Sequence, residues 1–228
     1  MTTTPAEDRA ALLRRHRRPE PTFVRAVATA LGDAHTVLEM RSGPVSYVPT
    51  DRSVVIEAPA DATLVTFPTA GDLADSVRRV SGPVVVLARD PDRLRAEWLD
   101  EYAHEVVAAE AATLPTLDEL AAVVGSSTEI IHLPVPFTCV DGFAEAYYAR
   151  PERLLEPDVR AADPLWSRVD DLTARRAVAA LRTALETGTW DDRHGALRRR
   201  PTLDGSVVLL TPGGLRAHRR VAERSFHR

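Results

Sequence analysis

The residues whose chemistry stands out lie in the C-terminal half of the chain. His194 follows Trp190-Asp191-Asp192-Arg193, so two aspartates stand close before an imidazole. An imidazole beside a carboxylate can take up and release a proton near neutral pH. We therefore predict His194 as a catalytic acid or base paired with one of the aspartates. The alternative is a capped turn that carries a surface histidine.

Cys139 and Asp141 flank a turn between a predicted strand and a predicted helix. In open α/β folds, ligands bind at the sheet edge where such turns lie. Asp141 is therefore either a catalytic acid that faces a substrate or the N-cap of the following helix. Cys139 either lines the substrate site or is a small buried hydrophobe, because nothing in the sequence places a base beside its thiol.

Aromatic residues make up 5% of the chain, and most of them fall in segments that we expect to line a cleft. Aromatic stripes usually form core, but this clustering favours a pocket for a flat or apolar ligand. The predicted substrate-binding residues, besides Cys139, are Trp98, Tyr102, Tyr147, Tyr148, Trp166 and Trp190.

Composition limits the class of protein. The 228 residues, 44% of them apolar, suffice for one domain with a well-developed core. A net charge of -4 and a pI near 6.0 argue against nucleic acid as a partner. We expect a small-molecule substrate, with a homodimer or a heteromer with a related protein as further possibilities.

Residue usage also restricts the chemistry and the compartment. All 29 basic residues are Arg, which is typical of a GC-rich actinobacterial genome and leaves no Lys for a Schiff base. The single cysteine and the scattered histidines predict no disulfide and no metal site. Because the start Met1–Asp8 has no leader pattern and no long apolar run follows, we expect a cytoplasmic protein without membrane contact.

Strand-like and helix-like segments alternate along the first two thirds of the chain. This alternation predicts a parallel, doubly wound α/β sheet, closed by a last antiparallel strand. The predicted strands are 36–40, 53–57, 62–67, 83–88, 129–135 and 207–211, and the predicted helices are 9–17, 22–31, 71–80, 91–112 and 116–124. Further helical segments at 143–148, 157–161, 164–172 and 173–187 are expected to form a cap over the carboxyl ends of the strands.

Several short motifs follow one another in a recognisable order. They include Arg17-Arg18-Pro19-Glu20-Pro21, Ser46-Tyr47-x-Pro49, Glu57-x-Pro59, Pro134-x-Pro136-x-x-Cys139-x-Asp141-Gly142-Phe143 and Gly188-x-Trp190-Asp191-x-Arg193-His194-Gly195. Over about residues 12–211 this order resembles that of small bacterial class I S-adenosylmethionine (SAM) methyltransferases. The resemblance implies a single domain with N-terminal helices to residue 32, a Rossmann-like core at 33–136, a helical cap at 137–206, and a last strand with a basic tail at 207–228.

The resemblance also implies a cofactor site after the first strand. The positions that match it are Glu39, Arg41, Gly43, Tyr47 and Glu57. Glu57 would bind the ribose hydroxyls of SAM or would simply face water. Arg41 would either bind a carboxylate or phosphate of a ligand or pair with Glu39 or Glu57.

Two departures from the family pattern predict that this site is impaired. The family loop Gly-x-Gly-x-Gly reads Arg41-Ser42-Gly43-Pro44-Val45 here. Side chains therefore fill the space beside the backbone that glycines would leave free for a ligand. Only about 25 residues separate Glu57 from Pro83, enough for one strand and one helix. We therefore expect a sheet one strand-helix unit short of the usual seven strands, and weak SAM binding or none.

These patterns favour a methyltransferase-like protein of secondary metabolism with no cofactor. It would catalyse a SAM-independent proton transfer, cyclisation or rearrangement on a small molecule, bound where the strand ends meet the cap. One alternative is an active SAM-dependent small-molecule methyltransferase. The other is a non-catalytic partner of an intact methyltransferase.

Overall fold

The computed structural model describes residues 5–76 and 78–213, so the predicted basic tail lies outside the described residues. The chain divides into two compact units, each built from three stretches of sequence. The first unit comprises residues 1–20, 91–114 and 133–206, and the second comprises 21–90, 115–132 and 207–228. No helix among the described residues is long and apolar enough to span a membrane.

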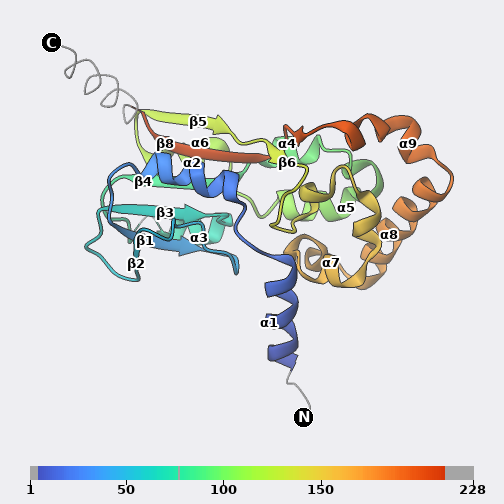
Figure 1. Cartoon of the computed structure of the whole chain (residues 1–228), viewed down its shortest axis with the longest axis horizontal. Coiled ribbons are helices and arrows are strands. Elements are labelled where there is room, and N and C mark those ends of the chain that lie inside the picture. Colours follow the sequence, from blue (N-terminus) through green and yellow to red (C-terminus); the bar gives the residue numbers. More distant parts are fainter. Residues whose placement is uncertain (1–4, 77, 214–228) are drawn as a thin grey trace. The chain divides into compact units, whose positions relative to one another are not determined.

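A six-stranded sheet forms the centre of the second unit, in the order β2-β1-β3-β4-β8-β5 (Figure 1). Strands β1 to β4 are parallel to one another, and β8 is antiparallel to both β4 and β5. The predicted parallel sheet with an antiparallel last strand is therefore confirmed. The strands are β1 (Thr36–Arg41), β2 (Ser53–Val55), β3 (Ala62–Thr66), β4 (Val84–Arg89), β5 (Thr128–His132) and β8 (Val207–Pro212).

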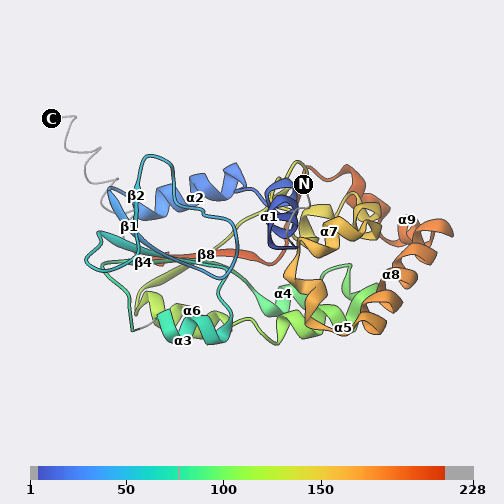
Figure 2. The same ribbon diagram turned by 90° about the horizontal axis from the view of Figure 1, so that it is seen from below.

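Helices cover both faces of this sheet (Figure 2). Helix α2 (Pro21–Leu31) lies on one face, and α3 (Ala70–Ser76) and α6 (Leu117–Val124) lie on the other. Helix α6 begins with a capping box in which Thr116 and Glu119 bind each other's backbone N–H groups. The α6 side of the sheet is sealed by a core of apolar side chains that includes Leu73, Val86, Leu120 and Leu210.

The sheet is reduced as predicted. Between β2 and β4 the chain forms one strand and one helix, β3 and α3, and β3 pairs directly with β1. Moreover, the connection from β1 to β2, residues 42–52, contains no helix. The described residues therefore hold six strands in this sheet, where the resemblance implies seven.

Several predicted elements differ in their bounds, among them the helix predicted at 9–17, which is α1 (Pro5–His16). The helix predicted at 91–112 is two helices, α4 (Pro91–Arg95) and α5 (Asp100–Ala111), because the turn between them buries the consecutive residues Trp98 and Leu99. The strand predicted at 129–135 stops at His132, since Pro134 has no N–H for a ladder. Strand β2 ends at Val55, so Glu57 lies beyond it.

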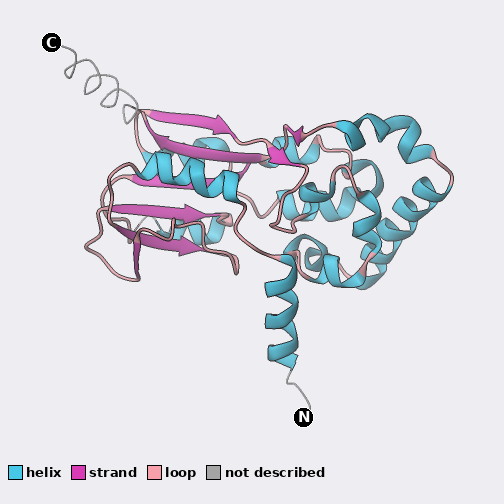
Figure 3. Cartoon of the chain, in the orientation of Figure 1, coloured by secondary structure: helices cyan, strands magenta, loops and turns pink. Residues whose placement is uncertain are grey.

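The first unit is mostly helical (Figure 3). Asp170 caps its longest helix, α8, by accepting hydrogen bonds from Leu172 N at 2.8 Å and Thr173 N at 3.0 Å, which is why the predicted helix 164–172 breaks there. The elements of this unit are α1 (Pro5–His16), α4, α5, η1 (Ala144–Tyr147), η2 (Pro151–Leu155), α7 (Pro157–Ala161), η3 (Pro164–Arg168), α8 (Asp171–Glu186), α9 (Thr189–His194), η4 (Gly195–Arg199), and the paired strands β6 (Val135–Pro136) and β7 (Thr202–Leu203).

Candidate functional site

The positions that match the family's cofactor site all lie in the second unit. Glu39 and Arg41 project from the same face of β1, two residues apart. Arg41 Nη1 donates to Glu39 Oε2 at 2.8 Å, so the pairing that the sequence left open is made. The Glu39 side chain is almost fully buried, and its Oε1 has no hydrogen-bond partner among the described residues. The guanidinium therefore neutralises a carboxylate of its own strand.

The segment 42–52 packs against α2 and Phe67 through the buried ring of Tyr47. Tyr47 is 0% exposed, and its ring lies 6.2 Å from the ring of Phe23 in α2 and 5.8 Å from that of Phe67. Gly43 does not have a positive φ, and a Cβ added there would meet nothing within 4 Å. Glycine is thus needed here neither for the turn nor for a close approach of another part of the described chain. Since no helix begins in this segment, no helix N-terminus lies at the end of β1 to receive an anion.

Glu57 lies in a different environment from the paired Glu39 and Arg41. It is exposed, two residues beyond the end of β2. The positions that match the family's cofactor site therefore include an arginine paired with a glutamate, a buried tyrosine and a solvent-exposed acid.

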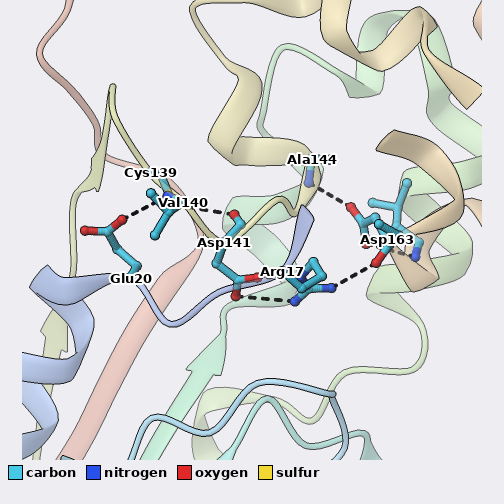
Figure 4. A network of polar contacts seen from close by, with 9 residues as sticks. Arg17, Glu20, Cys139, Val140, Asp141, Ala144 and Asp163 are labelled. Carbon is cyan, nitrogen blue, oxygen red and sulfur yellow. Dashed lines mark hydrogen bonds and ion pairs between the residues drawn. The ribbon is translucent and has the colours of Figure 1, made fainter. Parts of the chain in front are cut away.

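Asp141 belongs to a buried polar network of the first unit (Figure 4). Its carboxylate is 0% exposed and accepts from both Nε and Nη2 of Arg17, the latter at 3.3 Å. Gly142 N donates to the carbonyl of His16 at 2.8 Å, and a Cβ on Gly142 would stand 2.5 Å from that carbonyl oxygen. Arg17 and Asp141 thus form a two-pronged ion pair that fixes residues 16–17 against the loop before η1.

Two further carboxylates complete this network. Glu20 Oε2 accepts from Val140 N at 3.1 Å, and Asp163 Oδ2 accepts from Ala144 N at 2.7 Å. Figure 4 shows these acids on either side of the Arg17–Asp141 pair. Each acid satisfies a backbone N–H of the loop, so the network holds the loop in place.

Cys139 lies in the same loop with a buried side chain. Its thiol donates to the carbonyl of Asp141 at 3.5 Å. Burial, and then the negative charge of Glu20, raise the pKa of Cys139 well above its usual value. The thiol therefore stays protonated, which is the state of a packed hydrophobe and not of a nucleophile.

Four predicted site residues come together in one aromatic cluster of the first unit: Trp98, Tyr102, Trp190 and His194. The Trp190 ring packs edge-on against Trp98 with 5.5 Å between centroids. The imidazole of His194 has its centroid 5.7 Å from Trp190, 6.0 Å from Tyr102 and 6.3 Å from Trp98. Trp190 is fully buried, and the His194 side chain is 21% exposed.

The carboxylate beside His194 is not the one that the sequence indicates. His194 Nε2 lies 2.8 Å from Glu101 Oε2, and Glu101 also pairs with Arg193. Asp191 is instead bound by Arg198 Nε at 2.6 Å. The signal in the sequence that points to Glu101 is its position next to Tyr102 in α5, because this helix also supplies the Tyr102 ring to the cluster. Sequence distance hid it, since 93 residues separate the partners.

Burial and the neighbouring arginine set the protonation state of the imidazole. Burial, and then the positive charge of Arg193, lower the pKa of His194, so the ring is neutral at pH 7. A carboxylate only accepts hydrogen bonds, so Nε2 carries the proton that is donated to Glu101. Nδ1 is then the unprotonated nitrogen, and the pair is a carboxylate-oriented base.

The remaining predicted substrate residues make separate contacts in this unit. Tyr148 Oη donates to Arg200 O at 2.8 Å, and Trp166 lies under the guanidinium of Arg160 at 5.9 Å. The hydroxyl of Tyr147 lies next to Gly142. These three residues therefore line the Asp141 loop and the cap helices, and no ring contact joins them to the aromatic cluster among the described residues.

An open depression of about 330 Å³ lies in the second unit. Its lining includes Leu31, Asp33, His35, Asp61 and Val85, around the amino ends of β1, β3 and β4. This is the sheet edge opposite to the one at which open α/β folds bind ligands. None of the predicted site residues lines it. Within the described ranges, no three His, Cys, Asp or Glu side chains are grouped to hold a metal ion.

Comparison with known proteins yields a fold and no family. No family model matches the chain, and no curated protein matches it. One solved structure does, that of a candidate methyltransferase from an antibiotic biosynthesis pathway of Anabaena variabilis ATCC 29413. The match has a TM-score of 0.71 at 17% identity and covers 86% of this chain and 99% of the other. The chain thus has a methyltransferase-like fold.

Proposed function

We propose that this protein is an enzyme with a methyltransferase-like fold that does not use SAM and instead moves a proton on a small, flat molecule of secondary metabolism. The observation that carries the proposal is segment 42–52, in which a buried Tyr47 and its neighbours replace a glycine loop and a following helix. The antibiotic pathway of the structural neighbour supports secondary metabolism as the setting.

The residues at the former cofactor positions do not fit SAM in the manner that the resemblance implies. Arg41 neutralises Glu39 and leaves a positive side chain where a ligand would lie. Glu57 is solvated beyond the end of its strand. No step of the proposed reaction therefore involves this cofactor.

His194 is the proposed catalytic base. Glu101 acts as its positioning residue, because it holds the proton on Nε2 and leaves Nδ1 to accept one from a substrate. The rings of Trp98 and Tyr102 beside it suit a flat, apolar substrate. Asp141, the other catalytic residue predicted from the sequence, stays a prediction, and its burial against Arg17 supports a structural role.

Calorimetric titration with SAM, and with its demethylated product, tests the first half of the proposal. We expect no saturable heat up to about 1 mM ligand, which corresponds to a binding free energy weaker than about -4 kcal/mol. Saturable binding in the micromolar range would overturn this half. It would favour the second candidate, a SAM-dependent methyltransferase, which the fold of the neighbour supports.

Proton exchange into a flat ketone tests the second half. The probe is 2-tetralone in deuterated water, followed by NMR. We expect His194→Gln to abolish any catalysed exchange, and Glu101→Gln to weaken it with a shifted pH profile. The matched control is His104→Gln, which removes an exposed histidine of α5 that pairs with Asp100 at 3.0 Å. Equal losses in His194→Gln and His104→Gln, or no exchange above background in the wild type, would refute the assignment.

A further inference from the structure

Two buried hydrogen-bond donors of the aromatic cluster lack an acceptor. The Tyr102 hydroxyl and the Trp190 indole N–H are both buried, and neither has a hydrogen-bond partner among the described residues. Buried polar groups are usually paired, because an unpaired donor loses its hydration without compensation. Both donors belong to rings that contact His194, with 6.0 and 5.7 Å between centroids. An oxygen of a bound ligand would supply the acceptor beside the proposed base.

Tyr102 is the donor that a substrate at His194 can use. Trp190 is 0% exposed, and its ring contacts Trp98 and lies under the guanidinium of Arg198 at 4.7 Å. Tyr102 is half-buried, and the His194 side chain is 21% exposed. A flat molecule that reaches the imidazole therefore meets the Tyr102 ring before that of Trp190.

One short turn of α5 carries both groups that contact the imidazole. Glu101 Oε2 lies 2.8 Å from His194 Nε2, and the ring of the next residue, Tyr102, meets the imidazole edge-on at 79°. Consecutive side chains of a regular helix diverge by about 100°. Directly after them, Ala103 leaves the helical conformation with a φ of -136° and a ψ of 41°. Residues 100–102 are thus a separate first turn, which presents the carboxylate and the hydroxyl together.

We infer that Tyr102 is a second catalytic residue, whose hydroxyl donates to the carbonyl oxygen of an enolisable ketone while His194 Nδ1 removes a proton from the neighbouring carbon. This inference rests on the proposed function. It narrows the substrate from a flat molecule to one with a C–H group next to a ketone carbonyl.

The step is balanced without a further reactant. The electron pair of the C–H bond forms the C=C bond of the enolate, and the π pair of the carbonyl moves to oxygen. Negative charge grows on that oxygen, where a fixed donor stabilises the transition state most. The imidazolium, held by Glu101, then returns the proton to the same carbon or to a conjugated one. Burial raises the pKa of Tyr102, so its hydroxyl keeps its proton throughout.

Proton exchange into 2-tetralone in deuterated water tests the catalytic role. We expect Tyr102→Phe to lower kcat by about 100-fold, a typical effect of removing one donor from a developing oxyanion, with a smaller change in KM. If His194→Gln abolishes the exchange and Tyr102→Phe leaves it intact, this inference is wrong and the proposed function stands. A wild type that shows no exchange would overturn both.

Ligand binding separates the hydroxyl from its ring. The probes are 2-naphthol, a stable analogue of an enol, and 2-methylnaphthalene, which has a methyl group in place of the hydroxyl. In NMR titrations, Tyr102→Phe should weaken 2-naphthol about three- to tenfold, as loss of one hydrogen bond does, and 2-methylnaphthalene less than about twofold. The control His104→Gln, on the same helix, should bind both like the wild type. Equal weakening of the two ligands, no weakening of 2-naphthol, or a wild type that binds neither would overturn the assignment.

Stability gives a readout that does not depend on a ligand. Because the Tyr102 hydroxyl has no partner among the described residues, its removal should leave the free energy of unfolding unchanged or raise it. Tyr148→Phe is the comparison, since the Tyr148 hydroxyl donates to Arg200 O at 2.8 Å and its loss should destabilise the protein. In urea unfolding, a Tyr102→Phe variant destabilised as much as Tyr148→Phe would show that the hydroxyl is already paired within the fold, and the inference would be wrong.

Discussion

The buried ion pair between Arg17 and Asp141 makes the sharpest test of how the first unit is held together. The side chains of Arg17 and Asp141 are 8% and 0% exposed. Asp141→Asn keeps the shape of the side chain but removes the charge that pairs with the buried Arg17 guanidinium. Loss of one partner of such a pair destabilises a protein by about 3–5 kcal/mol.

The expected change in melting temperature follows from this free energy. For a chain of this length, each kcal/mol shifts the midpoint by about 2–4 °C, so Asp141→Asn should lower it by about 6–20 °C. Thermal unfolding followed by tryptophan fluorescence measures the melting temperature, and urea unfolding with the same signal gives the free energy of unfolding. The three tryptophans of the chain, Trp98, Trp166 and Trp190, all belong to the first unit, so the signal reports on the unit that contains the ion pair.

A double-mutant cycle separates the pair from the single residues. Arg17→Met should destabilise about as much as Asp141→Asn, since it leaves a buried carboxylate. The double variant should lose much less than the sum, because the two charges of the pair are removed together. The exposed pair of Arg15 and Asp158, 3.7 Å apart, provides the control, and Asp158→Asn should change the free energy of unfolding by less than about 1 kcal/mol. An Asp141→Asn effect no larger than this control would refute the reasoning.

Three further outcomes follow from single side chains. Gly142→Ala should lower the free energy of unfolding by about 1–3 kcal/mol, because its Cβ would stand 2.5 Å from His16 O. Gly43→Ala should change it by less than about 0.5 kcal/mol, because the structure places no other atom of the protein within 4 Å of the added Cβ. Equal effects of the two variants in denaturant unfolding would contradict this packing. Iodoacetamide should label Cys139 slowly in the native protein and fast in urea, since burial raises its thiol pKa; native labelling at the unfolded rate would argue for an accessible thiolate. Because the folded state lowers the pKa of His194, the unfolded chain takes up the proton first as the pH falls through about 6.5, so the free energy of unfolding should decrease as the pH is lowered through that value, and less so in His194→Gln. An identical pH dependence in both proteins would show that His194 does not titrate as described.

Much of the fold could be predicted from the sequence because the signals are local. The capping pair Thr116 and Glu119 lies three residues apart, and its hydrogen bonds form as the sequence indicates. The apolar run at 83–88 was predicted as a fully buried strand, and β4 is buried along its whole length. The reduced sheet followed from chain length, since the residues between Glu57 and Pro83 cannot form a further strand and helix.

The candidate site was predicted less completely, because its contacts join distant residues. Trp98, Tyr102, Trp190 and His194 were predicted as site residues, and the fold brings them together. The carboxylate beside His194 was predicted among its sequence neighbours, but Arg198 occupies Asp191 and Glu101 takes its place. Sequence proximity is a poor guide to such pairs, since several charges compete for each partner and packing decides between them.

The sequence by itself therefore determined the order of strands and helices along the chain, the cap at Thr116, and the number of strands in the sheet, because these depend on hydrogen bonds and apolar periodicity within a few residues and on the length of chain available. Tertiary structure alone decided which buried groups meet. Arg17 finds Asp141 across 124 residues, and Tyr47 closes over Phe23 where the family pattern would place a cofactor loop. Such contacts depend on how whole elements pack, and burial then decides which of the possible ion pairs must form.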